Sequence, residues 1–85
     1  MKIEFDPDKD TINRAKHGVS LSRGIDLEIL AYVEDLRFSE PRFRLYGLID
    51  GVAHCLAGAD RDGSIRVISL RRAHAKEMRR YAPND

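Results

Sequence analysis

Cysteine is nearly absent from this chain of 85 residues, and long apolar runs are missing altogether. The single cysteine, Cys55, excludes an internal disulfide and a zinc site built from several cysteines. No run approaches the ~20 apolar residues of a membrane-spanning helix, and the first residues lack the apolar segment of a signal peptide. We therefore expect a cytoplasmic protein without membrane contact, folded as a single domain over residues 1–85.

Net charge is also small, at +1 from 15 basic and 14 acidic residues, but it is unevenly distributed. Residues 1–36 carry a net charge of −3 and residues 61–85 a net charge of +4. Arginine outnumbers lysine by 11 to 4, and its planar guanidinium forms bidentate contacts with phosphate that lysine cannot form. This pattern indicates a local anion site. A solvated helix face with partner carboxylates is the alternative.

The first third of the chain predicts a short strand followed by two helices. Alternation over residues 2–5 indicates the strand. Asp6-Pro7 is typical of a helix start and Gly18 of a left-handed C-cap, so a helix is expected over residues 7–17. A second helix is expected over about residues 21–31, from an apolar stripe at four-residue spacing: Leu21, Ile25 and Ile29.

From residue 42 the hydrophobic period changes to two, which predicts a meander of three strands. The strands are expected at 42–49, 52–59 and 64–70. Asp50-Gly51 is a strong signal for a two-residue hairpin turn of type I′, and residues 60–63 form the second turn. These connections are too short for crossovers, so the strands must be antiparallel.

The C-terminal segment predicts a last helix, which begins at Arg71 or Arg72 and runs to about Tyr81. The fold class is therefore α+β: a small antiparallel sheet with two N-terminal helices and one C-terminal helix. Helices on one face leave the other face free to carry arginine and tyrosine. Residues 32–41 are left open, with a short edge strand at 32–38 as one possibility.

Three blocks of residues then occur together and in order. They are residues 5–9 with Asn13 and residues 16–20, Glu40-Pro41-Arg42 with Gly47, and residues 65–73 with Glu77 and Tyr81. Together they resemble the BrnT family of type II toxins, which are small ribonucleases with a RelE-like fold. The resemblance covers about residues 3–81. The chain departs from the family pattern at Phe5, Leu21 and Leu70, where side chains of other sizes are usual; these changes affect packing more than chemistry.

The resemblance implies a ribonuclease toxin that a cognate antitoxin, encoded beside it, neutralises. Antitoxins of this family typically carry a ribbon-helix-helix region, so operator DNA would be contacted only through the antitoxin. A non-catalytic module that binds the antitoxin and acts as co-repressor is the alternative function. Covering of the arginine face is the expected mode of inhibition, and capture at a remote surface is the other possibility.

Metal-free RNA cleavage needs a base, an acid and fixed cations, and we expect no metal or other cofactor. The candidate catalytic residues are Arg71, Glu77, Tyr81 and His17. The candidate RNA- or phosphate-binding residues are Lys16, Arg42, Arg44, Arg66 and Arg72.

Each of these candidate roles has an alternative. Glu77 near several arginines should stay ionised and orient them, while Tyr81, one helical turn later, could donate a proton or pack its ring on the sheet. His17 has a suitable pKa for proton transfer but could simply complete its helix end. RelE-like ribonucleases often lack a histidine pair, which favours the arginines. Those arginines could still be ordinary surface residues paired with carboxylates.

Overall fold

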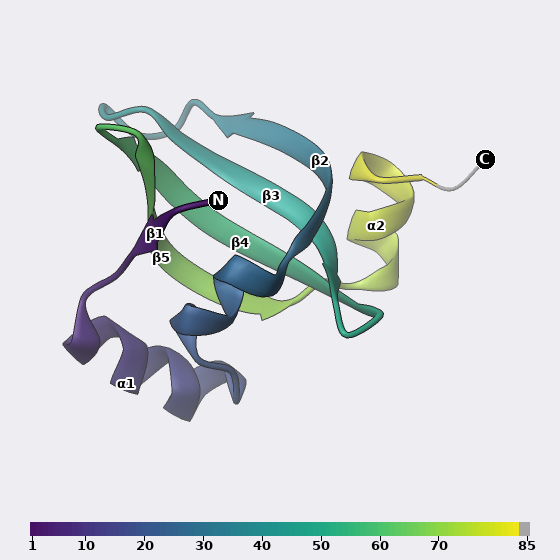
Figure 1. Ribbon diagram of the computed structural model, residues 1–85. Coiled ribbons are helices and arrows are strands. Elements are labelled where there is room, and N and C mark those ends of the chain that lie inside the picture. The colour runs from purple at the N-terminus through teal and green to yellow at the C-terminus, as the bar shows by residue number, and fades with distance from the viewer. Residues whose placement is uncertain (84–85) are drawn as a thin grey trace.

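The computed structural model describes residues 1–83, which form a five-stranded sheet with helices at its N- and C-terminal ends (Figure 1). The elements in chain order are β1 (Ile3–Glu4), α1 (Pro7–His17), the 3-10 helix η1 (Leu21–Asp26), β2 (Glu28–Asp35), β3 (Arg42–Ile49), β4 (Val52–Arg61), β5 (Ser64–Arg72) and α2 (Ala75–Tyr81). The sheet order is β1-β5-β4-β3-β2, with β1 parallel to β5 and all other pairs antiparallel. The expected α+β class is confirmed, with one parallel pair added to the antiparallel sheet.

Helix α1 begins and ends where its capping residues predict. The Asp6 side chain accepts a hydrogen bond from the backbone N–H of Asp8 at 2.9 Å, and Gly18 adopts φ 74° at the C-cap. The helix buries a polar residue, Asn13, instead of an apolar stripe. The Asn13 amide donates to the carbonyls of Leu70 (2.8 Å) and Val19 (2.9 Å) and accepts from the Leu70 N–H (3.2 Å). A polar clamp therefore holds α1 against β5.

The expected second helix over residues 21–31 is wrong beyond Asp26. Residues 21–26 form η1, and residues 28–35 form the edge strand β2. Pairing of β2 with β3 overrides the helical spacing, since a short apolar run does not by itself distinguish a strand from a helix. The possible edge strand at 32–38 is thus part of a strand that begins earlier and ends at Asp35.

The meander forms as predicted, with β4 and β5 each two residues longer than expected. Strand β3 spans the expected residues, and Asp50 and Gly51 both have positive φ (51° and 76°), as a type I′ turn requires. Strand β5 continues to Arg72, which pairs with His54 of β4. The prediction that the last helix begins at Arg71 or Arg72 is therefore wrong, because both residues belong to β5 and α2 begins at Ala75.

The core lies between one face of the sheet and the α1–η1 segment. Its buried members are Leu21, Leu27, Phe43, Leu45, Ile49, Leu56, Val67 and Leu70, with Phe5 packed against them. Leu21 and Leu70, two of the three departures from the family pattern, lie inside this core, and the third, Phe5, packs against it. Their positions agree with the expected effect on packing.

The edge strand crosses β3 very closely at Gly47. An added Cβ at this position would lie 2.0 Å from the carbonyl oxygen of Glu28. The register of β2 on β3 also shifts between Ile29 and Ala31, where a bulge is inserted. Only glycine at position 47 therefore allows β2 to start where it does. Within residues 1–83, no helix has both the length and the apolar character needed to cross a bilayer.

Candidate ribonuclease site

The sheet face opposite the core carries a row of side chains from three strands. Tyr46 of β3 pairs in register with Cys55 of β4, which pairs with Arg71 of β5. Because residues directly opposite each other point to the same face, these three side chains lie side by side. Helix α2 joins them there through its contacts with Arg71 and Tyr46.

Arg71 and Glu77 form a bidentate ion pair. Nη1 and Nη2 of Arg71 donate to Oε1 and Oε2 of Glu77 at 2.8 and 2.9 Å. Oε1 also accepts the backbone N–H of His74 at 3.0 Å, which closes the capping box of α2. The Arg71 guanidinium lowers the pKa of Glu77 to about 2, although partial burial opposes this shift. Glu77 is therefore ionised at neutral pH and orients Arg71, as the sequence analysis expects.

Tyr46 connects this ion pair to a second arginine. Its hydroxyl donates to Oε2 of Glu77 at 3.1 Å and accepts from Nη1 of Arg44 at 2.8 Å. The residue has no solvent exposure, and burial raises the pKa of its phenol well above the ordinary value. Tyr46 therefore stays protonated and acts as a donor. No role was predicted for Tyr46 from the sequence. Its spacing of two residues from Arg44 in a strand does place both side chains on the same face of the sheet.

Tyr81 completes the group from α2. Its ring stacks on that of Tyr46, with centroids 5.0 Å apart and an interplanar angle of 14°. The guanidinium carbon of Arg44 lies 5.2 Å from the Tyr81 centroid. The ring thus packs on the sheet and also contacts a cation. We refer to the five residues Arg44, Tyr46, Arg71, Glu77 and Tyr81 as the Arg44–Glu77 cluster.

A hollow of about 280 Å³ adjoins this cluster, and we call it the arginine hollow. Its lining includes four arginines and a single carboxylate: Arg37, Arg42, Arg44, Arg71 and Asp35. That carboxylate is already engaged, because Asp35 accepts from Arg37 at 2.7 and 2.8 Å, and these hydrogen bonds lower its pKa to about 2. Arg37, Arg42 and Arg71 each pair with a carboxylate, so within residues 1–83 the uncompensated positive charge of the hollow is that of Arg44, and this charge suits an anion.

Arg44 forms no ion pair within residues 1–83, unlike the other three arginines of this hollow. Its Nε is buried and has no hydrogen-bond partner within residues 1–83. A buried unpaired donor costs about 1–3 kcal/mol in free energy of folding. Such groups in native proteins are often functional.

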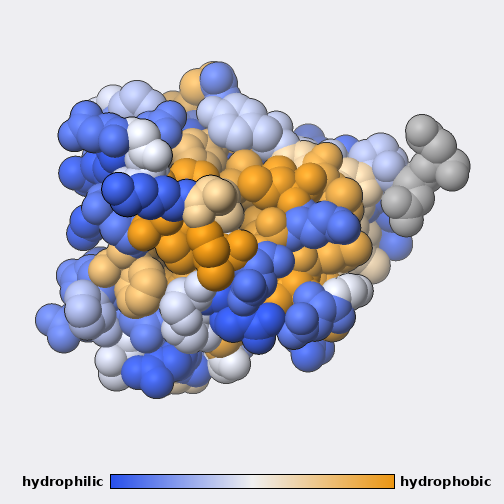
Figure 2. Space-filling model, viewed as in Figure 1, coloured by the Kyte–Doolittle hydropathy of each residue, from blue (hydrophilic) through white to orange (hydrophobic). Residues whose placement is uncertain are grey.

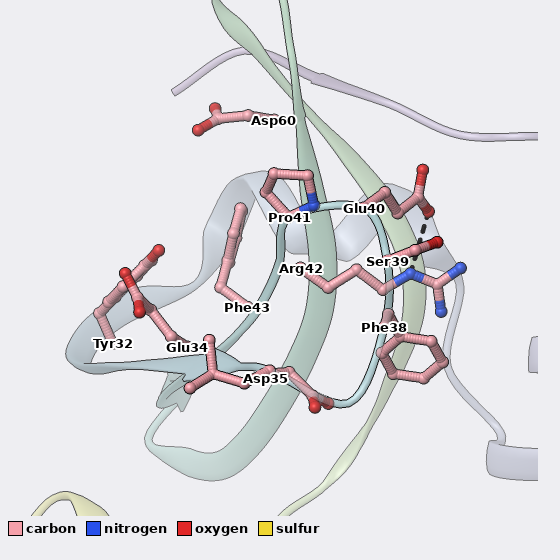
Figure 3. A pocket seen from close by; sticks show the side chains of 11 residues that line it. Tyr32, Glu34, Asp35, Phe38, Ser39, Glu40, Pro41, Arg42, Phe43 and Asp60 are labelled. Atoms are coloured by element: carbon pink, nitrogen blue, oxygen red, sulfur yellow. Dashed lines mark hydrogen bonds and ion pairs between the residues drawn. The ribbon is translucent and has the colours of Figure 1, made fainter.

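A neighbouring hollow under the β2–β3 loop has a different character (Figure 3). It measures about 300 Å³, and its lining includes the carboxylates of Glu34, Asp35, Glu40 and Asp60. Arg42 borders it, lying 4.0 Å over the Phe38 ring with its Nε 3.0 Å from Glu40 (Figure 3). The acidic lining repels phosphate, so this hollow does not suit RNA.

The remaining predicted residues lie elsewhere. Arg72 follows Arg71 in β5, so its side chain points to the opposite face of the sheet. There it lines a third hollow, of about 450 Å³, together with His17 and His54. Lys16 is exposed at the end of α1, and Arg66 lies 3.9 Å from Glu4. The structure thus gathers Arg42, Arg44, Arg71, Glu77 and Tyr81, and it separates His17, Lys16, Arg66 and Arg72 from them.

Comparisons with known proteins identify a family and a similar fold. A family model described as "Ribonuclease toxin, BrnT, of type II toxin-antitoxin system" matches residues 5–77. The crystal structure of the Brucella abortus ribonuclease toxin BrnT superposes with a TM-score of 0.69 at 24% sequence identity, covering 87% of this chain and 97% of that one. At this identity the similarity supports the fold. A search of curated proteins found no match.

Proposed function

Because this chain belongs to the BrnT family of ribonuclease toxins of type II toxin–antitoxin systems, we propose that it is an endoribonuclease that cleaves RNA at the Arg44–Glu77 cluster without a metal ion. The observation that carries this proposal is the arginine hollow beside the cluster. Its lining favours phosphate over a metal cation, since Asp35 already binds Arg37 and the nearby Glu77 already binds Arg71.

The proposed reaction uses the ribose 2′-OH as nucleophile. A bond forms between the 2′-oxygen and phosphorus while the bond to the 5′-oxygen breaks, which leaves a cyclic phosphate. Arg44 and Arg71 hold the scissile phosphate and offset the charge that grows on the phosphorane. Tyr81, the half-buried phenol of the cluster, donates a proton to the leaving 5′-oxygen, and water takes the proton of the 2′-OH.

Two residues position the others in this proposal. Glu77 fixes the plane of the Arg71 guanidinium, and Tyr46 joins Arg44 to the same carboxylate. Arg42 extends the phosphate path along the arginine hollow. Lys16, Arg66 and Arg72 would bind flanking RNA only outside this hollow, and His17 would transfer a proton only to RNA that reaches the opposite face.

A type II toxin implies a cognate antitoxin. We infer from the family resemblance that this antitoxin carries a ribbon-helix-helix region, that operator DNA is bound through it, and that the pair acts in the cytoplasm. In an electrophoretic mobility-shift assay, retardation of operator DNA by the antitoxin and by the complex, but not by the isolated chain, would support this assignment. A shift by the chain alone would contradict it.

The proposed activity is tested by incubating antitoxin-free protein with RNA in the presence of EDTA. We expect cleavage by the wild type and a loss of about a hundredfold or more in Arg44→Lys, which keeps the charge but loses the planar donors. Intact RNA with the wild-type protein would contradict the proposal. It would favour the co-repressor alternative, which agrees with the engagement of both terminal nitrogens of Arg71 by Glu77.

A further inference from the structure

The surface over η1 and β2 exposes several large apolar side chains. Ile25, Ile29, Leu30 and Tyr32 retain 46–58% of their accessible surface. Figure 2 shows this apolar area on the same side of the molecule as β1 and η1. Strand β2 is also an edge of the sheet, and no strand within residues 1–83 pairs with the backbone groups on its outer side. An exposed apolar edge is a template for pairing with another chain.

The charges around this surface exclude RNA as its occupant. Glu28 and Glu34 are exposed on β2, and no ion pair within residues 1–83 involves either of them. Two free carboxylates repel a phosphate backbone. The partner must therefore be a protein that offers apolar side chains and positive charge.

A second copy of this chain does not meet that requirement. Antiparallel pairing of two β2 strands about Ala31 places Glu28 opposite Glu34 at both ends. In that register the bulge after Ile29 turns the two side chains to opposite faces, but a shift of one residue in one direction places Glu28 opposite Asp35, and parallel in-register pairing places each acid opposite itself. The shift in the other direction places Glu28 opposite Val33. Like charges directly opposite each other on neighbouring strands are destabilising. In every register, moreover, a second β2 offers three carboxylates and no lysine or arginine, so it cannot supply the positive charge that Glu28 and Glu34 call for.

We propose that the cognate antitoxin binds here, by adding an apolar and basic segment to β2 as a further strand. Pairing of main chains would supply the affinity, and basic residues opposite Glu28 and Glu34 would set the register. The inference requires the type II partnership that family membership establishes; it does not depend on which residues cleave RNA.

This position favours remote capture over the covering of the arginine face. The Arg44–Glu77 cluster is built from β3, β5 and α2, and none of its residues lies on β2. A groove lined by Leu30, Leu48 and Met78 connects β2 to the outer side of α2. A bound segment would therefore contact the helix that carries Glu77 and Tyr81, and it would meet the arginine hollow only at Asp35, the residue of β2 that lines it.

The test measures binding of the purified product of the reading frame beside the gene for this chain, by titration calorimetry. We expect Ile29→Thr and Glu34→Lys each to weaken binding by about tenfold or more. Two variants on α1 serve as controls: Ile12→Thr removes an isoleucine that is more exposed than Ile29 (61% against 46%), and Asp8→Lys makes the same change in net charge. Both controls are expected to bind like the wild type.

RNA cleavage by each free variant is assayed in parallel, and we expect the rates of the wild type. This readout shows that the variants fold, and it separates the inference from the proposed ribonuclease site. Undiminished binding by both β2 variants would overturn the inference. So would a lack of binding by the wild type, or a dimer of the free chain that Ile29→Thr dissociates.

Discussion

Arg44 donates from Nη1 to the hydroxyl of Tyr46 at 2.8 Å, and the same hydroxyl donates to Glu77. Through this single oxygen, a cation on β3 and a carboxylate on α2 share one hydrogen-bond network. The network contains no proton that titrates near neutral pH, since Glu77 is ionised and the pKa of the Tyr46 phenol is raised by burial. Its role is therefore to position Arg44 and Arg71.

The Tyr46→Phe variant tests this positioning role. It keeps the ring that stacks on Tyr81 and removes only the hydroxyl. A hydrogen bond to a charged group is worth about 1.5–3 kcal/mol, so kcat should fall by about tenfold to a hundredfold. KM should change little, because the arginines remain in place to bind phosphate. Steady-state kinetics on a short RNA would check this, and a rise in KM at constant kcat would contradict it.

Replacement of His17 by alanine distinguishes the two faces of the sheet. His17 lines the hollow with His54 and Arg72, away from the Arg44–Glu77 cluster. We expect the His17→Ala variant to cleave RNA within about threefold of the wild-type rate, against the large loss in Arg44→Lys. A loss in His17→Ala comparable to that of Arg44→Lys would move the chemistry to the opposite face. Thermal denaturation of both variants controls for folding.

Acid should destabilise the protein between about pH 5 and pH 2. Arg71 and Arg37 lower the pKa values of Glu77 and Asp35 to about 2, below those of the unfolded chain. The stabilisation from each carboxylate is thus complete above about pH 5 and is lost as the pH falls through the folded pKa. Urea denaturation of Glu77→Gln should show a shallower loss of unfolding free energy over this range than the wild type. An unchanged slope would argue against the ion pair.

The Asn13→Asp variant tests the clamp between α1 and β5. It replaces the amide that donates to the carbonyls of Leu70 and Val19 with an oxygen that faces both of them. The Leu70 N–H can still donate to one carboxylate oxygen, but the other oxygen would face two carbonyls in a buried position, so the free energy of unfolding should fall by about 3 kcal/mol or more. Urea denaturation measures this change. The neighbouring exposed Ile12→Thr should cost well under half as much, and equal losses would contradict the assignment.

Local chemistry explains which parts of the fold could be predicted. The capped helix α1 and the β3–β4 hairpin follow from residues close in sequence, such as Asp6 and Asp50-Gly51. Strand β2 was predicted only in part, as a possible edge strand at residues 32–38, because its first residues depend on pairing with β3 across Gly47. The spacing of Leu21, Ile25 and Ile29 fits a helix equally well, and only the tertiary pairing decides between the two.

The candidate site could be predicted in part for the same reason. Glu77 as a partner of arginine follows from the charge pattern, and the structure bears out the contact. Placing Arg71 and Arg72 together at a helix start was wrong, because β5 continues through both and alternation sends them to opposite faces. The hydrogen bond from Tyr46 to Glu77 depends on the position of α2, which local sequence patterns do not predict.

The missing side chain at residue 47 has a consequence for a cell that makes this protein. An added methyl group at residue 47 would displace β2, the strand to which we propose that the antitoxin binds. The Arg44–Glu77 cluster, which we propose cleaves RNA, lies on β3, β5 and α2. Such a mutation is expected to weaken antitoxin binding and to leave the ribonuclease site in place. We therefore expect a cell to tolerate many substitutions in the ribonuclease site more readily than Gly47→Ala.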